Sequence, residues 1–145
     1  MTPVKPSLRR TRHPAVTPPR AGPFHLAARA LGALPVINHF LDRLRLDALW
    51  ARYVPSTDPR YGVAPATALG VLVRNLLVQR APVYGLQEWA APLEPAQLRL
   101  APHELPRLND DRVGRALDRL FDADRASLLT ECGFRSIVNA RITPS

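Results

Sequence analysis

Cysteine is almost absent from this sequence of 145 residues, and its single copy, Cys132, has no partner for an intrachain disulfide. One cysteine also excludes a zinc site built from several thiolates, and it suits a reducing cytoplasm. The chain has no apolar run of about 18 residues, so the sequence predicts no membrane-spanning helix. The charged N-terminus is not followed by an apolar segment of roughly 7–15 residues, which predicts that no secretory signal is present.

The motifs of common enzymes are missing as well. With only seven glycines, the chain has no glycine-rich phosphate loop, and it has no nucleophile-elbow motif. Its four histidines are scattered, whereas a metal site needs three or four converging ligands. These histidines are His13, His25, His39 and His103. We therefore predict no catalytic residue, no metal, no cofactor and no small-molecule substrate.

Acidic side chains are missing from the first thirty residues, which carry +6 of the formal net charge of +8. The six basic residues are Lys5, Arg9, Arg10, Arg12, Arg20 and Arg29. Because this segment also holds six prolines, which disfavour helix and sheet, we predict a disordered tail over residues 1–30. A flexible cationic arm suits attraction to a polyanion such as DNA. The same composition suits a solubilising tail or a misassigned upstream start codon equally well.

Helical periodicity begins near residue 34 and predicts an all-α fold. Apolar residues at i, i+3, i+4 and i+7 follow Pro35, and a second stripe ends at Val54, before Pro55. Residues 66–80 are apolar around most of a helix, which predicts a central helix with Leu76 and Leu77 in the core. Shorter helices are expected over residues 82–91 and 96–100.

Two further helices are expected near the C-terminus, with Asn109 and Asp124 as N-caps and Gly133 as a stop. Residues 134–145 show no clear pattern. The whole chain thus predicts a compact bundle of about five to seven short helices around one central apolar helix. Three large aromatic residues occupy inward positions of their stripes, so we expect core residues rather than base-stacking platforms: Trp50, Trp89 and Phe121.

The segment after Asn109 holds paired aspartates, Asp110 and Asp111, which could bind magnesium or could stabilise a helix N-terminus. Adjacent helical residues point about 100° apart, which favours the capping role.

Three arginines of the same segment, Arg112, Arg115 and Arg119, share one side of the predicted helix and could grip successive phosphates. The neighbouring Asp111, Asp118 and Asp122 have the spacing of helical ion pairs, so a salt-bridged surface is the favoured interpretation. Arg74, on the narrow polar side of the central helix, either pairs with an acid or contacts a partner.

Three strings of the chain resemble one known family. LGALPVINHFLDRLRLD, over residues 31–47, is similar to the start of the helical N-terminal domain of insertion-sequence-four-type transposases, a domain of unknown function numbered 4277. VLVRNLLVQRAPVYGLQEWA, over residues 71–90, resembles that domain's long helix, its arginine-proline-leucine-tyrosine turn and its glutamate-tryptophan segment. LNDDRVGRALDRLFDAD, over residues 108–124, resembles the family signature, here Asn109, Asp110, Asp111, Gly114, Arg115, Ala116, Leu117 and Asp118.

The resemblance implies an accessory domain that, in full-length relatives, precedes a ribonuclease-H-like catalytic domain with three metal-binding carboxylates. This chain departs from that pattern after residue 131, where GFRSIVNARITPS holds no aspartate or glutamate. No catalytic residue of the family can therefore be carried over. We expect residues 31–133 to form the helical domain, and residues 134–145 to be the irregular remnant of a junction to a missing catalytic domain. A decayed, frameshifted or split element would give such a chain.

Two main hypotheses for function follow. The leading one is a truncated bacterial transposase N-terminal domain that binds DNA, such as element ends, or assists synapsis, without catalytic activity alone. Its candidate DNA contacts are Arg9, Arg10, Arg12, Arg20, Arg112, Arg115 and Arg119. The alternative is an oligomerisation module that binds a second copy or a separately encoded catalytic half and touches no DNA, which the nearly neutral body favours. An enzyme with a reduced site is a third hypothesis, and no converging ligand set supports it.

Two expectations accompany these hypotheses. A chain with either role would be cytoplasmic, and it would be nucleoid-associated if it binds DNA. We also expect an exposed apolar patch where a missing domain would otherwise cover the helices.

Overall fold

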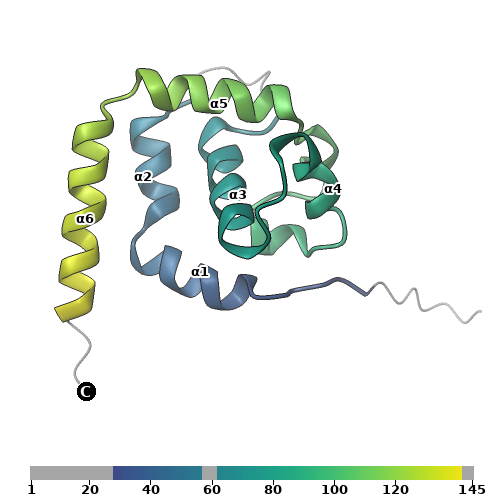
Figure 1. Cartoon of the computed structure of the whole chain (residues 1–145), viewed down its shortest axis with the longest axis horizontal. Coiled ribbons are helices and arrows are strands. Elements are labelled where there is room, and N and C mark those ends of the chain that lie inside the picture. The colour runs from purple at the N-terminus through teal and green to yellow at the C-terminus, as the bar shows by residue number, and fades with distance from the viewer. Residues whose placement is uncertain (1–27, 57–61, 142–145) are drawn as a thin grey trace, which may run out of the picture.

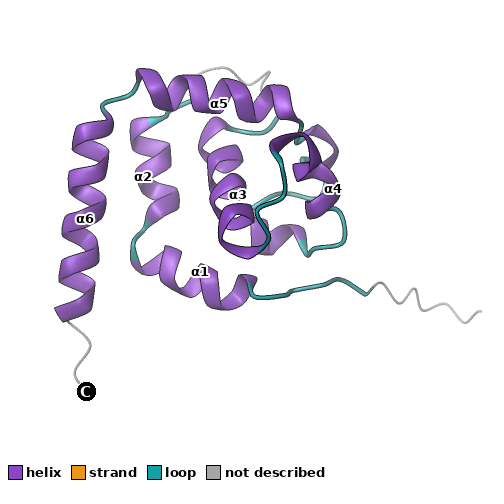
Figure 2. Ribbon diagram, in the orientation of Figure 1, coloured by secondary structure: helices purple, strands orange, loops and turns teal. Residues whose placement is uncertain are grey.

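The computed structural model describes residues 28–56 and 62–141, which form an all-α bundle. The six α-helices of these residues are α1 (Leu34–Arg43), α2 (Leu46–Tyr53), α3 (Pro65–Val78), α4 (Leu86–Ala90), α5 (Asp110–Asp122) and α6 (Arg125–Arg141) (Figure 1). Three short 3-10 turns connect them, at Val83–Gly85, Pro95–Leu98 and Leu105–Arg107. Figure 2 shows helices and loops but no strand in the described chain. No helix of this part is long and apolar enough to cross a membrane.

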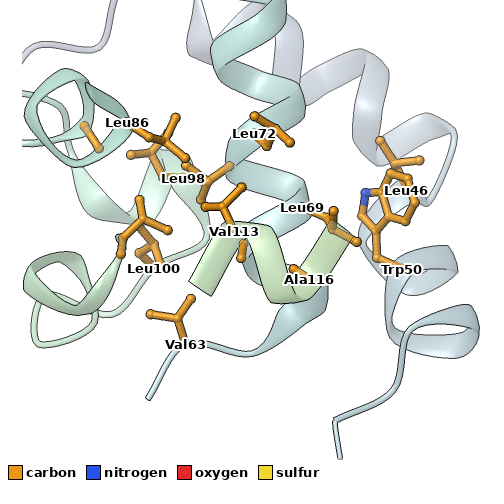
Figure 3. Close-up of a cluster of buried hydrophobic side chains, with 14 of the residues drawn as sticks. Leu46, Trp50, Val63, Leu69, Leu72, Leu86, Leu98, Leu100, Val113 and Ala116 are labelled. Carbon is orange, nitrogen blue, oxygen red and sulfur yellow. The ribbon is translucent and has the colours of Figure 1, made fainter. Parts of the chain in front are cut away.

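The helix α3 lies at the centre, as its apolar sequence predicts. The helix α5 crosses one end of α3, α1 lies at the opposite end, and α2 and α4 flank it (Figure 1). Leu69 and Val71 of α3 are 2% and 0% exposed. Val113 and Ala116 of α5 are fully buried and lie over α3 near Leu69 (Figure 3). The predicted central helix and the predicted all-α bundle are both confirmed.

The last turn of α3 differs from the prediction. Leu76 and Leu77 were expected in the core, but they are 51% and 58% exposed. The buried positions of α3 end at Asn75, because the neighbouring helices cover its first three turns and not its last. An apolar helix is therefore buried only where other elements reach it.

The C-terminal helix also differs from the prediction. The expected stop at Gly133 and the expected irregular chain over residues 134–145 are wrong for residues 134–141, since α6 continues to Arg141. A single glycine inside a helix costs only about 1 kcal/mol relative to alanine, so it need not end one. Residues 142–145 lie outside the described residues.

The predicted tail ends earlier than residue 30. Ala30 pairs with the segment after α4, because its N–H donates to Pro92 O at 3.0 Å and its carbonyl accepts from Glu94 N at 3.1 Å. Arg29 Nη1 donates to Ala91 O at 3.2 Å. Residues 28–30 thus belong to the folded body, and residues 1–27 lie outside the described residues.

Arg74 is the largest fully buried side chain, and each of its three guanidinium nitrogens donates at least one hydrogen bond. Its Nε donates to Asn38 Oδ1 of α1 at 2.8 Å. Its Nη1 and Nη2 donate to the two carboxylate oxygens of Asp47 in α2, at 3.3 and 3.1 Å, and Nη1 also reaches Gly70 O at 3.0 Å. Of the two roles considered for Arg74, the structure shows pairing with an acid.

We predict opposite effects for alanine at two helical glycines. A Cβ at Gly70 would lie 2.9 Å from Arg74 Nη1 and 3.1 Å from Asp47 Oδ1, and neither group can move without breaking its hydrogen bonds. Gly70→Ala should lower the free energy of unfolding by about 1–3 kcal/mol. Gly114→Ala, where a Cβ meets nothing within 4 Å, should raise it by about 0.5–1 kcal/mol. Urea denaturation of both variants tests this, and a stabilised Gly70→Ala would show that the Arg74 site is loose.

Candidate functional site

The helix α5 carries the arginines that the sequence singled out, and the structure gives each of them an internal partner. Arg115 forms an ion pair with Asp111 one turn earlier. Arg119 Nη1 donates to Pro55 O at 3.0 Å, which ties α5 to the end of α2. Arg112 is half-buried and also has an interaction within the chain. These three side chains are engaged within the fold, as the salt-bridged interpretation expects for Arg115.

The aspartates of α5 act at its N-terminus. The Asn109 side chain accepts from Arg112 N at 2.9 Å, which confirms the predicted N-cap. Asp110 and Asp111 lie in the first turn, where their charges favour the helix dipole. No group of three His, Cys, Asp or Glu side chains is close enough to hold a metal ion within the described part of the chain. With four aspartates and three arginines, α5 is a poor surface for phosphates.

The aromatic predictions hold for two residues and fail for one. Trp50 and Trp89 are each 8% exposed and belong to the core, as predicted. Phe121 was expected in the core but is 67% exposed, and its ring lies 4.4 Å from the Arg125 guanidinium carbon. It lies at the end of α5, beyond the buried Val113 and Ala116, so the helices below no longer cover it. The candidate contacts Arg9, Arg10, Arg12 and Arg20 lie outside the described residues.

A different set of arginines gathers where α6 lies against the α1–α2 corner. A hollow of about 280 Å³ there, which we call the arginine groove, is lined by Arg43, Arg45, Phe134, Arg135, Val138 and Asn139. Three guanidinium groups at one hollow make a site suited to anions. No local sequence pattern reveals this hollow, because its members come from segments about 90 residues apart.

Reciprocal hydrogen bonds hold α6 at this corner. Arg43 Nη2 donates to Asn139 O at 2.7 Å, and Asn139 Nδ2 donates to Arg43 O at 2.6 Å. Arg135 Nη1 donates to Leu44 O at 3.4 Å. Leu128 is the only buried residue of α6, so these polar contacts supply much of its attachment to the bundle.

Arg45 differs from its neighbours in the groove. It is the N-terminal flanking residue of α2, with φ 50° and ψ 42°, a left-handed conformation that is costly for a residue with a side chain. Its side chain is exposed and makes no hydrogen bond or ion pair within residues 28–56 and 62–141. A glycine would be less strained at this position, and the same left-handed conformation occurs at two other arginines, Arg80 and Arg99.

Glu131 is the centre of the contact between α6 and α2. Its carboxylate accepts from Tyr53 Oη at 2.9 Å, from Arg135 Nη2 at 2.5 Å and from Arg52 Nη1 at 3.2 Å. The hydrogen bond from Tyr53, followed by those from the arginines, lowers the pKa of Glu131 below its ordinary value. The same hydrogen bond raises the pKa of Tyr53.

Comparison with known proteins gives one match. The family described as "Domain of unknown function (DUF4277)" matches residues 26–133. Curated proteins and solved structures give no match.

We predict that Glu131 stabilises α6 in a pH-dependent way. Because its folded-state pKa is lowered, the stabilisation is present above the ordinary glutamate value, near pH 4, and is lost as the pH falls through the folded value. Glu131→Gln should therefore melt a few degrees below the wild type at pH 7, and the difference should vanish toward pH 3. Thermal melts followed by circular dichroism measure this, with the exposed Glu88→Gln as the control. A difference that persists unchanged at pH 3 would rule out the carboxylate as its source.

Proposed function

This chain belongs to the family of the domain of unknown function DUF4277, and we propose that it acts as a DNA-binding accessory module of a transposase. The family match spans the three strings that resemble insertion-sequence-four-type transposases, over residues 31–124. The proposal assigns no chemical step to this chain: its role is to hold DNA, for example at element ends or during synapsis. A protein with this role would act in the cytoplasm, at the nucleoid.

The observation that carries the proposal is Arg45. Arg45 is exposed and makes no side-chain hydrogen bond or ion pair within the described residues, and it lines the same hollow as Arg43 and Arg135, so its guanidinium is placed to bind an external anion. Guanidinium groups bind phosphates in a fork geometry, and phosphate contacts of this kind position a protein on DNA without reading its sequence.

Charge is unevenly placed on the folded body, which favours the groove over α5 as the DNA-facing side. The helix α5 carries four aspartates and three arginines, so its net charge is negative. At the groove, the carboxylate that contacts Arg135 is that of Glu131, which also accepts from Tyr53 and Arg52. The basic residues of the first thirty positions would add attraction for DNA that depends strongly on salt.

A second candidate function is oligomerisation within a transposase assembly, with no direct DNA contact. The exposed apolar side chains of the last two helices favour it, and they fit the apolar patch that the sequence predicts. They are Leu117 and Phe121 of α5 and Leu129, Phe134 and Ile137 of α6, at 39–68% exposure.

We predict that Arg45 contributes one phosphate contact. Arg45→Gln should weaken binding to duplex DNA roughly three- to tenfold near 0.1 M salt and lower the slope of log K against log salt by about 1. Arg45→Gly should weaken binding equally while raising the free energy of unfolding, because it removes the left-handed strain. Fluorescence anisotropy across a salt series measures the first effect, and urea denaturation the second.

Two controls separate the groove from other basic residues. Arg115→Gln, on α5, should leave the affinity and the salt slope unchanged. The combined Arg9, Arg10, Arg12 and Arg20 to Gln variant should weaken binding without changing the effect of Arg45→Gln. If the Arg45 variants bind DNA like the wild type, the groove is not the DNA site. If the four-arginine variant also loses all DNA binding, oligomerisation is left as the role of the helical body.

A further inference from the structure

We propose that the arginine groove binds single-stranded DNA, with a phosphate on its guanidinium groups and an unpaired base stacked on the ring of Phe134. The inference rests on the proposed DNA-binding function and deepens it, because it names the form of DNA that the groove takes. It depends on one aromatic side chain, Phe134, which lines the same hollow as the three arginines.

The ring of Phe134 is open to a stacking partner. The side chain is 67% exposed, and no other aromatic ring or guanidinium contacts its face within the described residues. Phe121 is equally exposed, but the guanidinium carbon of Arg125 lies 4.4 Å from the centre of its ring. Exposed apolar side chains are common on proteins, so exposure alone identifies no partner. The arginines beside Phe134 distinguish it from Leu129 and Ile137, the other large exposed apolar residues of α6, which do not line the groove.

Phe134 separates two hollows on the surface of α6. One is the arginine groove, and the other is a hollow of about 460 Å³ lined by Ala126, Ser127, Thr130, Glu131 and Phe134 itself. Because the second hollow has a carboxylate and no arginine, the phosphate is expected in the groove and the base against the ring. Figure 1 shows α6 at the edge of the molecule, with α2 on one side and none of the other described helices on the opposite side. A nucleotide chain can therefore approach Phe134 from outside the bundle.

The guanidinium groups retain donors for a phosphate. Each guanidinium has five N–H donors in a planar fork. Hydrogen bonds within the described part of the chain use one nitrogen of Arg43, two nitrogens of Arg135 and none of Arg45. Phosphate oxygens can thus bind without replacing the hydrogen bonds that hold α6 against the α1–α2 corner.

The pairing of a cationic hollow with an exposed ring favours an unpaired strand over a duplex. In a duplex the faces of each base are covered by its neighbours, so the arginines could bind phosphates while Phe134 stayed exposed to water. In a single strand the base faces are accessible, and proteins that bind single strands combine a positively charged groove with aromatic side chains on which bases stack. Phe134 and Arg135 are neighbours on α6 and line one hollow, so a single nucleotide can contact both.

A strand with and without bases tests the stacking contact. Phe134→Leu keeps an apolar side chain but removes the ring, and it should weaken the binding of an oligothymidine strand about fivefold or more. The same substitution should leave unchanged the affinity for duplex DNA and for a strand of abasic sugar-phosphate units, because neither offers a base face. Fluorescence anisotropy at one salt concentration measures all three ligands. Phe121→Leu, at an equally exposed ring outside the groove, is the matched control and should bind like the wild type.

The outcomes of that series separate this inference from the proposed function. Arg45→Gln should weaken binding of all three ligands, since each of them carries phosphates. If Phe134→Leu affects the thymidine and abasic strands equally, or affects neither, the stacking proposal is overturned, and a weaker duplex affinity of Arg45→Gln would then uphold the proposed function without it. A wild type that binds none of the three ligands would overturn both proposals.

An indole at position 134 reports the stacking directly. Phe134→Trp should bind oligothymidine at least as tightly as the wild type, and the strand should quench the fluorescence of the added indole by stacking on it. Phe121→Trp carries the same two buried tryptophans, Trp50 and Trp89, and should keep its fluorescence. Circular dichroism should show wild-type helix content for both variants, because both positions are exposed. Equal quenching of the two variants, or no quenching of Phe134→Trp, would contradict the proposal.

Discussion

The buried guanidinium of Arg74 is the constraint on which the rest of the structure depends. A buried charge is strongly destabilising unless acceptors and an opposite charge surround it, so the fold must deliver them from several elements. Asn38 comes from α1, Asp47 from α2 and the Gly70 carbonyl from α3 itself. Asn38 extends the network, because its Nδ2 donates to both the backbone and the side chain of Gln97 at 2.9 and 3.0 Å. Arg74 therefore links α1, α2 and α3 through the hydrogen bonds of one side chain.

That placement explains the surface on which the candidate site lies. Asn38 and Asp47 can both face Arg74 only if the chain turns sharply between α1 and α2, and the turn is made by Arg45 in its left-handed conformation. Arg99 reinforces the same corner through Asp42 at 2.6 Å. The helix α6 then attaches to the outside of the corner through Arg43, Asn139 and Arg135. The arginine groove is thus a consequence of the buried network, even though its own arginines are not buried.

Local sequence patterns predicted the positions and N-caps of the helices better than they predicted which side chains are exposed. The N-caps at Asn109 and Asp124 were predictable because each bond joins residues three apart, and Asp124 indeed accepts from Ser127 N at 3.0 Å. The central position of α3 followed from its apolar circumference. The partners of Arg74 lie 27 and 36 residues away, so no local pattern identifies them. The exposure of Phe121 and Leu77 could not be read from periodicity either, because a helical stripe does not reveal where its covering helices end.

The two candidate functions both involve α6, and its two sides explain how they can coexist. The inward side of α6 is held by polar contacts centred on Glu131 and Asn139, so it supplies Arg135 to the groove without needing a large buried apolar surface. Leu129, Phe134 and Ile137 of α6 are consequently left exposed within the described residues, and they are among the side chains that favour oligomerisation.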